Sequence, residues 1–177
     1  MIYVVPWTSV NHLLIKGGTT AMKIMDFLSK KAISANLKST SKDGIIEEMV
    51  DLLINAQEVD KKDKKKLIDI LMERESLGST AIGQGIGIPH GKSDCVDKLV
   101  ASFGTSQNGV NFNSLDGEPV YIFFLLVAPQ DSAGPHLKAL ARISRLLKDK
   151  YFRDSLRQAK DEKAILKIIS EEDDKRL

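Results

Sequence analysis

Apolar residues recur every three or four positions through the first part of the chain, and this spacing predicts amphipathic helices. After a short apolar segment at residues 24–28, Ser41 is placed to cap one helix, and residues 61–75 fit a second. Apolar side chains on one face of each helix are expected to point into the core: Ile46, Met49, Val50 and Leu53 in the first, and Leu67, Ile68, Ile70 and Leu71 in the second.

The middle of the chain predicts strands instead. Residues 80–88 are apolar but contain three glycines, residues 99–105 fit a strand, and Asn108-Gly109 fits a turn. Residues 119–128 form a nearly continuous apolar run, which is typical of a strand buried on both faces. We therefore expect helices on both sides of the sheet.

The helical spacing returns after Pro135, a residue that suits the first position of a helix. A last helix is predicted near residues 161–170. The residues expected to face the core in these two helices are Leu137, Leu140, Ile143, Leu147, Ile165, Ile168 and Ile169. Helices that precede, flank and follow a few strands indicate an α/β fold, a three-layer α/β/α sandwich with a mixed sheet of about five strands.

The first 21 residues differ from the rest, since Lys16 is their only charged side chain and Pro6 interrupts their apolar stretch. They lack the basic start and continuous apolar core of a secretory signal. We interpret residues 1–21 as an N-terminal extension, residues 22–171 as one domain, and residues 172–177 as a C-terminal tail.

Composition limits the function classes. The 177 residues hold 26 Lys plus Arg and 24 Asp plus Glu, a net charge of +2, without the strongly basic balance of a nucleic-acid binder. The longest apolar run is too short to span a membrane. One cysteine, Cys95, excludes an internal disulfide. These features predict a soluble cytoplasmic domain that binds no nucleic acid and does not insert into membranes.

His90 stands in an unusual setting, after Pro89 and before Gly91. Because proline cannot donate to a sheet ladder, the strand is expected to stop there and leave His90 on the rim. Neighbouring glycines let the backbone approach a ligand, and an imidazole held there fits a nucleophile that accepts and passes on a phosphoryl group. The alternative is a turn histidine without a chemical role.

Two further residues fit phosphoryl chemistry. His136 falls in the first turn of the helix after Pro135, where a neutral imidazole could donate to an anion, or could simply cover the helix end. Arg74 carries a guanidinium fork that matches phosphoryl oxygens, but an arginine between two glutamates is more often a surface ion pair.

Other readings of the charged residues are weaker. The lysine-rich start of the second helix is expected to be a solvated face rather than an anion site. A metal site built from His90, His136 and Asp94 or Asp131 lacks the spacing of known metal motifs, so no metal is expected.

One motif is similar to a known family. Arg74-Glu75, Ser79-Thr80 and the run from Ile82 to Lys92 that contains Ile88-Pro89-His90-Gly91-Lys92 resemble the active-site signature of enzyme IIA of the fructose–mannitol class. This class belongs to the bacterial phosphoenolpyruvate-dependent phosphotransferase system and includes the nitrogen-regulatory enzymes IIA. Later segments, Leu115-Asp116-Gly117-Glu118-Pro119-Val120 and Pro135-His136-Leu137 into Arg145-Leu146-Leu147, look like the same family.

The resemblance implies a phosphotransferase with a phosphohistidine intermediate and a mixed sheet between helices. His90 matches the phosphorylated histidine, Arg74 the arginine beside it, and His136 the second, unphosphorylated histidine. The implied donor is the phosphocarrier HPr or its nitrogen-system counterpart, and the implied acceptor is enzyme IIB or a regulated target protein. Gly91 and Thr80 are expected phosphate contacts, and no cofactor is implied.

Three functions stay open at this point. The absence of fused transporter domains slightly favours a nitrogen-regulatory enzyme IIA over a sugar-specific one that donates to enzyme IIB. A binding module that holds an anion without transferring it is the third reading. The simultaneous presence of His90, His136 and Arg74 argues against that module.

Overall fold

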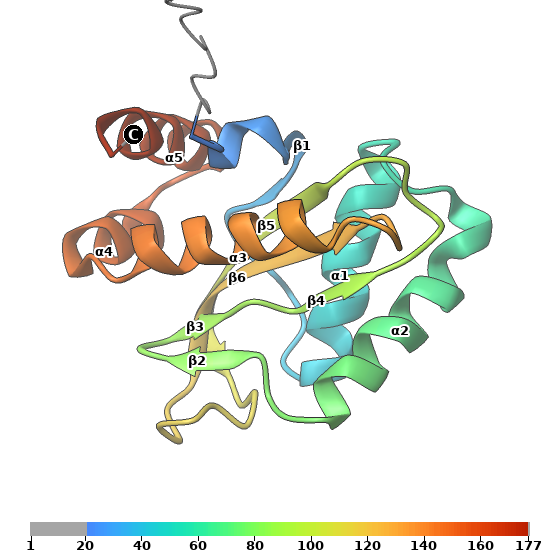
Figure 1. Ribbon diagram of the computed structural model, residues 1–177. Coiled ribbons are helices and arrows are strands. Elements are labelled where there is room, and N and C mark those ends of the chain that lie inside the picture. The colour runs from blue at the N-terminus through green and yellow to red at the C-terminus, as the bar shows by residue number, and fades with distance from the viewer. Residues whose placement is uncertain (1–20, 177) are drawn as a thin grey trace, which may run out of the picture.

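The computed structural model describes residues 21–176, in which a mixed six-stranded sheet lies between two layers of helices (Figure 1). The predicted extension at residues 1–21 lies, except for Ala21, outside the described residues. The helical segments are η1 (Ile24–Asp26), α1 (Lys42–Asn55), η2 (Lys61–Asp63), α2 (Lys64–Ser76), α3 (Ala133–Leu147), α4 (Lys150–Gln158) and α5 (Glu162–Lys175). The strands are β1 (Leu28–Ser34), β2 (Ala81–Gly83), β3 (Ile86–Gly87), β4 (His90–Lys92), β5 (Val100–Val110) and β6 (Val120–Ala128).

Strand β6 organises the sheet. It pairs antiparallel with β5 on one side and parallel with both β3 and β4 on the other. Outside these, β1 runs parallel to β5, and β2 pairs antiparallel with β3. The mixed sheet predicted from the sequence is therefore confirmed.

The alternating side chains of β6 supply two separate cores. Phe124 and Leu126 pack on one face of the sheet with η1, α3, α4 and α5. Phe123 and Leu125 pack on the other face with α1 and α2. The continuous apolar run thus reflects a strand covered on both sides, and the three-layer sandwich is confirmed. None of the helices described between residues 21 and 176 is long and apolar enough to cross a membrane.

Two of the elements that the sequence pattern missed, β1 and α4, contain few apolar residues. Strand β1 is an edge strand whose Lys30 and Lys31 are exposed. Helix α4 buries only Phe152 and Leu156, which are four residues apart and so share one face. A hydrophobic stripe of two residues is too short to be recognised by its period.

Three expectations about boundaries and burial were wrong. The Asn108-Gly109 pair does not end a strand, because β5 continues to Val110 across a register shift at which Gly109 takes a positive φ of 74°. Leu137 is 67% exposed, because the buried stripe of α3 passes through His136, Ala139 and Ile143 instead. The expected tail at residues 172–177 is helical through Lys175 in α5.

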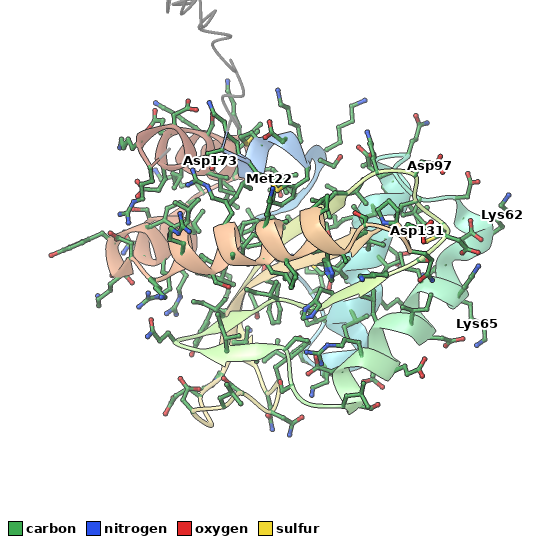
Figure 2. The ribbon with its side chains drawn as sticks, viewed as in Figure 1. Met22, Lys62, Lys65, Asp97, Asp131 and Asp173 are labelled. Atoms are coloured by element: carbon green, nitrogen blue, oxygen red, sulfur yellow. The ribbon has the colours of Figure 1, made fainter. Side chains whose placement is uncertain are left out.

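A buried ion pair fixes α3 in place. Arg142 of α3 donates from Nε and Nη2 to Oδ1 of Asp173 on α5, over 3.0 and 2.7 Å. The other carboxylate oxygen of Asp173 accepts from the backbone N–H of Met25 in η1. Figure 2 labels Asp173 where α5 meets the segment that leads into η1. The pair therefore ties three segments together on the face that carries His136.

Replacing Arg142 with Met should lower the free energy of unfolding by about 3–5 kcal/mol, because it leaves the Asp173 carboxylate buried without its cation. Urea denaturation followed by circular dichroism measures this loss. Arg145→Met, an exposed change three residues further along the same helix, is the matched control and should stay within about 0.5 kcal/mol. Equal losses of unfolding free energy in the two variants would contradict a stabilising role of the Arg142–Asp173 ion pair.

Candidate functional site

A cleft opens along β4, between the last turns of α2 and the first turn of α3. Its volume is about 360 Å³. The lining residues come from three elements and from the residue that follows α2: Ile70, Glu73, Arg74, Leu77, His90, Gly91, Lys92 and His136. Four of the five site residues expected from the sequence, His90, His136, Arg74 and Gly91, are thus brought together from positions up to 62 residues apart.

The chain reaches this cleft without leaving the sheet. The expected strand end at Pro89 is correct only for β3, since β4 resumes pairing with β6 at His90 opposite Leu126. The carbonyl of Pro89 accepts from the N–H of Leu126 over 2.9 Å. Proline removes one N–H donor from the strand pairing, but the chain stays alongside β6. His90 therefore starts an edge strand that is anchored to the central one.

The His90 ring is half-buried and is hydrogen-bonded to the backbone two residues earlier in the chain. Its Nδ1 lies 2.7 Å from the carbonyl oxygen of Ile88. Because a carbonyl only accepts, Nδ1 carries the proton, and Nε2 of the neutral ring holds the lone pair. Burial lowers the pKa of His90 below its usual 6.5, and the charge of Arg74 acts in the same direction against the opposing effects of Ile88 and Glu75. The ring is neutral at pH 7 and presents a nucleophilic nitrogen.

His136 faces this ring from α3. The two ring centroids are 5.5 Å apart with planes inclined by 57°. The His136 side chain is buried, and its Nε2 has no hydrogen-bond partner among the described residues. Burial, followed by the nearby His90 and Lys92, lowers the pKa of His136 to about 4. A neutral imidazole in this position brings one N–H donor to the site.

Arg74 lies in the last turn of α2 at the edge of the cleft. Its Nη1 donates to the carbonyl of Gly78 over 3.0 Å, which uses one of the five N–H donors of the guanidinium. The surface ion pair with a neighbouring glutamate is not found among the described residues, because the Glu75 carboxylate is buried and bound elsewhere. The guanidinium is thus held at the cleft without a carboxylate partner.

Of the two phosphate contacts expected from the sequence, Gly91 lines the cleft and Thr80 does not. A Cβ added at Gly91 would lie 3.1 Å from Cγ2 of Ile70, so glycine at this position lets β4 pack closely against α2. Thr80 is buried and does not line the cleft. Its hydroxyl donates to Oε2 of Glu75 over 2.6 Å. The expected phosphate contact at Thr80 is therefore not provided by this arrangement.

Lys92 is a site residue that the sequence reasoning missed. It stands two positions after His90 on β4, and side chains two apart on a strand point to the same side. Strand alternation, had β4 been recognised, is the signal that could have found it. Glu75 is a second residue of this region that the sequence reasoning did not single out as functional.

The remaining charged candidates lie outside the cleft. Asp94 pairs with Lys66, and no group of three metal-ligating side chains occurs within residues 21–176. Lys62 and Lys65 point away from the body of the molecule (Figure 2). Lys65 pairs with Asp69, and Lys64 with Glu47 and Asp51. The lysine-rich start of α2 is accordingly a solvated face, as the sequence predicts.

Comparison with known proteins adds an independent line of argument. Residues 26–172 match the family described as "Phosphoenolpyruvate-dependent sugar phosphotransferase system, EIIA 2". The chain is 38% identical over 149 residues to a nitrogen regulatory protein of Bradyrhizobium diazoefficiens, covering 84% of this chain and 95% of that one. It is 39% identical over 152 residues to the fructose-specific EIIABC component of Bacillus subtilis, covering 86% of this chain but 24% of that longer protein.

A solved structure of a nitrogen regulatory protein has a similar fold. The nitrogen regulatory protein IIA-Ntr from Neisseria meningitidis superposes with a TM-score of 0.73 at 28% identity, covering 81% of this chain and 97% of that one.

The low pKa of His136 predicts a pH dependence of stability. Between pH 6.5 and about 4 the unfolded chain binds a proton at this residue that the folded chain does not. The contribution to the free energy of unfolding is therefore complete above pH 6.5 and declines as the pH falls towards 4. In His136→Gln, the slope of unfolding free energy against pH should be smaller over this interval, as measured by urea titrations at several pH values. An unchanged slope would mean that the ring titrates normally in the fold.

Proposed function

The chain belongs to the EIIA 2 family of the phosphoenolpyruvate-dependent sugar phosphotransferase system, and from that premise we propose that His90 is the residue that carries the phosphoryl group. A phosphotransferase role in general follows from the family. The observation that carries the residue assignment is the hydrogen bond between His90 Nδ1 and the Ile88 carbonyl, because it leaves Nε2 as the free nucleophile in a cleft shared with Arg74 and His136.

The proposed reaction is an in-line transfer between two imidazoles. The Nε2 lone pair of His90 attacks the phosphorus of a donor phosphohistidine, the donor N–P bond breaks, and its electron pair returns to the donor nitrogen. The proton on His90 Nδ1 stays hydrogen-bonded to Ile88. The second transfer, to an acceptor, reverses these roles, with His90 as the leaving group.

The three equatorial phosphoryl oxygens need donors that are already in place. Arg74 and Lys92 supply positive charge from two sides of the cleft, and His136 supplies one N–H from α3. Gly91 brings the backbone of β4 close to the same space. Fixed donors of this kind stabilise the transition state without reorganising, so no metal is assigned a role in the proposal.

The proposed donor is HPr or its nitrogen-system counterpart. We favour the nitrogen-regulatory type, in which the phosphorylated and unphosphorylated forms bind a target protein differently. Support comes from the similarity to a nitrogen regulatory protein over 95% of that protein's length and from the structural likeness to IIA-Ntr. The 39% identity to a fructose-specific component supports the second candidate, a sugar-specific enzyme IIA that donates to enzyme IIB. Rates of labelling by the two carriers, and of transfer to enzyme IIB, would distinguish these two functions.

His90→Ala should abolish labelling, because it removes the ring whose Nδ1–H is held by Ile88 and whose Nε2 is left free in the cleft, while Nε2 of the second ring there, His136, is buried. The protein is incubated with enzyme I, each carrier in turn and phosphoenolpyruvate, and one acid-labile phosphoryl adduct is sought by intact mass. The chain contains three histidines, so His12→Ala, at a position outside the described residues, is the control and should keep the adduct. An adduct on the His90→Ala protein would contradict the assignment. Its absence from the unsubstituted protein with both carriers would support the anion-binding module instead.

Arg74→Met should slow labelling by about 10²-fold, the usual effect of removing one donor from a developing oxyanion. His136→Ala should also slow labelling while a stable adduct on His90 still forms, because the nucleophile is intact. Rapid-quench measurement of the adduct against time gives both rates, with Arg145→Met as the charge control. An unchanged rate in His136→Ala would assign His136 to covering the helix end alone.

A further inference from the structure

An unbroken series of hydrogen bonds connects a buried ion pair to the proposed nucleophile. It begins at Lys42 on α1, passes through Glu75 at the end of α2 and Thr80 before β2, and reaches His90 through Ile88. None of these residues except His90 lines the cleft. An effect of the series on the site therefore has to pass through the position of His90.

The first part of the series is an ion pair between a partly exposed ammonium and a buried carboxylate. The ammonium of Lys42 lies 3.0 Å from Oε1 of Glu75, whose side chain is only 3% exposed. The Lys42 ammonium also lies 5.1 Å from the centroid of the Phe112 ring, a favourable cation–π contact. A buried carboxylate with one cation still has a second oxygen to satisfy.

Thr80 donates two hydrogen bonds to the second carboxylate oxygen of Glu75. Its backbone N–H and its hydroxyl both donate to Oε2 of Glu75, over 3.0 and 2.6 Å. Its carbonyl in turn accepts from the N–H of Ile88 over 3.0 Å. Thr80 is thus fixed on one side by a carboxylate and fixes, on the other, the residue whose carbonyl holds His90.

The last step decides which nitrogen of His90 is reactive. The Ile88 carbonyl accepts from Nδ1 over 2.7 Å, and a shift of this carbonyl would free the ring to rotate or to move its proton to Nε2. A proton on Nε2 would remove the lone pair that attacks phosphorus. Building on the function proposed above, we propose that Glu75 is a positioning residue, which keeps His90 in the Nδ1–H form with Nε2 toward the cleft by anchoring Thr80 and, through it, Ile88.

The geometry of the Glu75 carboxylate makes this testable by two substitutions at one position. Methionine is of similar length but accepts no strong hydrogen bond, so Glu75→Met leaves the Thr80 N–H without a partner. In Glu75→Gln, the amide oxygen can still accept both bonds from Thr80, while its NH₂ faces Lys42, whose side chain is 19% exposed and can turn to solvent. The first variant breaks the series and the second preserves its Thr80 half.

The primary readout does not depend on phosphoryl transfer. Long-range ¹⁵N–¹H spectra of the His90 ring distinguish the Nδ1–H from the Nε2–H form. We expect the Nδ1–H form in the unsubstituted protein and in Glu75→Gln, and a mixture of both forms in Glu75→Met. Labelling by the phosphocarrier should be on the order of tenfold slower in Glu75→Met and close to the unsubstituted rate in Glu75→Gln.

A matched pair of threonine variants covers the case in which Glu75→Met does not fold. Thr80→Val removes only the hydroxyl donor to Glu75, and Thr105→Val removes a comparable buried hydroxyl that donates to the Ala35 carbonyl over 2.8 Å. Both should lose similar stability in urea denaturation. Only Thr80→Val should shift the His90 tautomer and slow labelling, and Thr80→Ser, which keeps the hydroxyl, should restore both.

These measurements separate the two proposals. If the tautomer shifts in Glu75→Met and Thr80→Val but the unsubstituted protein takes no label, the positioning role stands and the phosphocarrier assignment fails. If labelling occurs and neither variant changes the tautomer or slows transfer beyond Thr105→Val, Glu75 is only a structural residue and the inference is overturned.

Discussion

The pairing of β4 with β6 is the constraint on which the site depends. β6 is buried on both faces and is held between β5 and the β3–β4 edge, so its position is set by two cores at once. Because His90 pairs with Leu126 on that strand, the backbone of the proposed nucleophile is as firmly placed as the centre of the sheet. Two of the other proposed donors, Arg74 and His136, approach His90 from α2 and α3, one helix from each of the outer layers. A catalytic group on a rigid strand edge, approached from both sides, is well suited to a reaction in which positioning supplies most of the rate.

Burial at the edge of the sheet formed by β4 also keeps the imidazoles of His90 and His136 neutral. Loss of water around His90 and His136 lowers both pKa values, and the nearby His90 ring lowers the pKa of His136 further. A protonated His90 would have no lone pair to offer. Nε2 of His136 is buried and has no hydrogen-bond partner among the described residues, which is an unfavourable state for a polar atom.

Much of the fold and of the site follows from local patterns in the sequence. The helices with a full apolar stripe, the buried strand at residues 119–128 and the motif around His90 were all recognisable. What could not be predicted depends on long-range pairing. The edge strand β1 carries exposed lysines, the register shift near Gly109 is set by β6, and the burial of Glu75 depends on Lys42, which is 33 residues earlier. A Glu beside an Arg in a charged helix gives no local sign that one faces the cleft and the other the interior.

Within residues 21–176 the positive groups of the cleft have no carboxylate partner, which suits the proposed role of a carrier that both accepts and releases a phosphoryl group. Among the described residues, Arg74 binds only the Gly78 carbonyl, while Asp173 and Glu75 are each committed to their own cation elsewhere. In the proposed reaction, an arriving phosphoryl group would therefore meet positive charge that no carboxylate neutralises. The cleft is nevertheless open, and the exposed Glu73 on its wall opposes a second negative charge. In the proposed reaction, solvent and Glu73 would therefore offset the attraction by Arg74 and Lys92, so that a phosphoryl group bound at His90 could still be passed on.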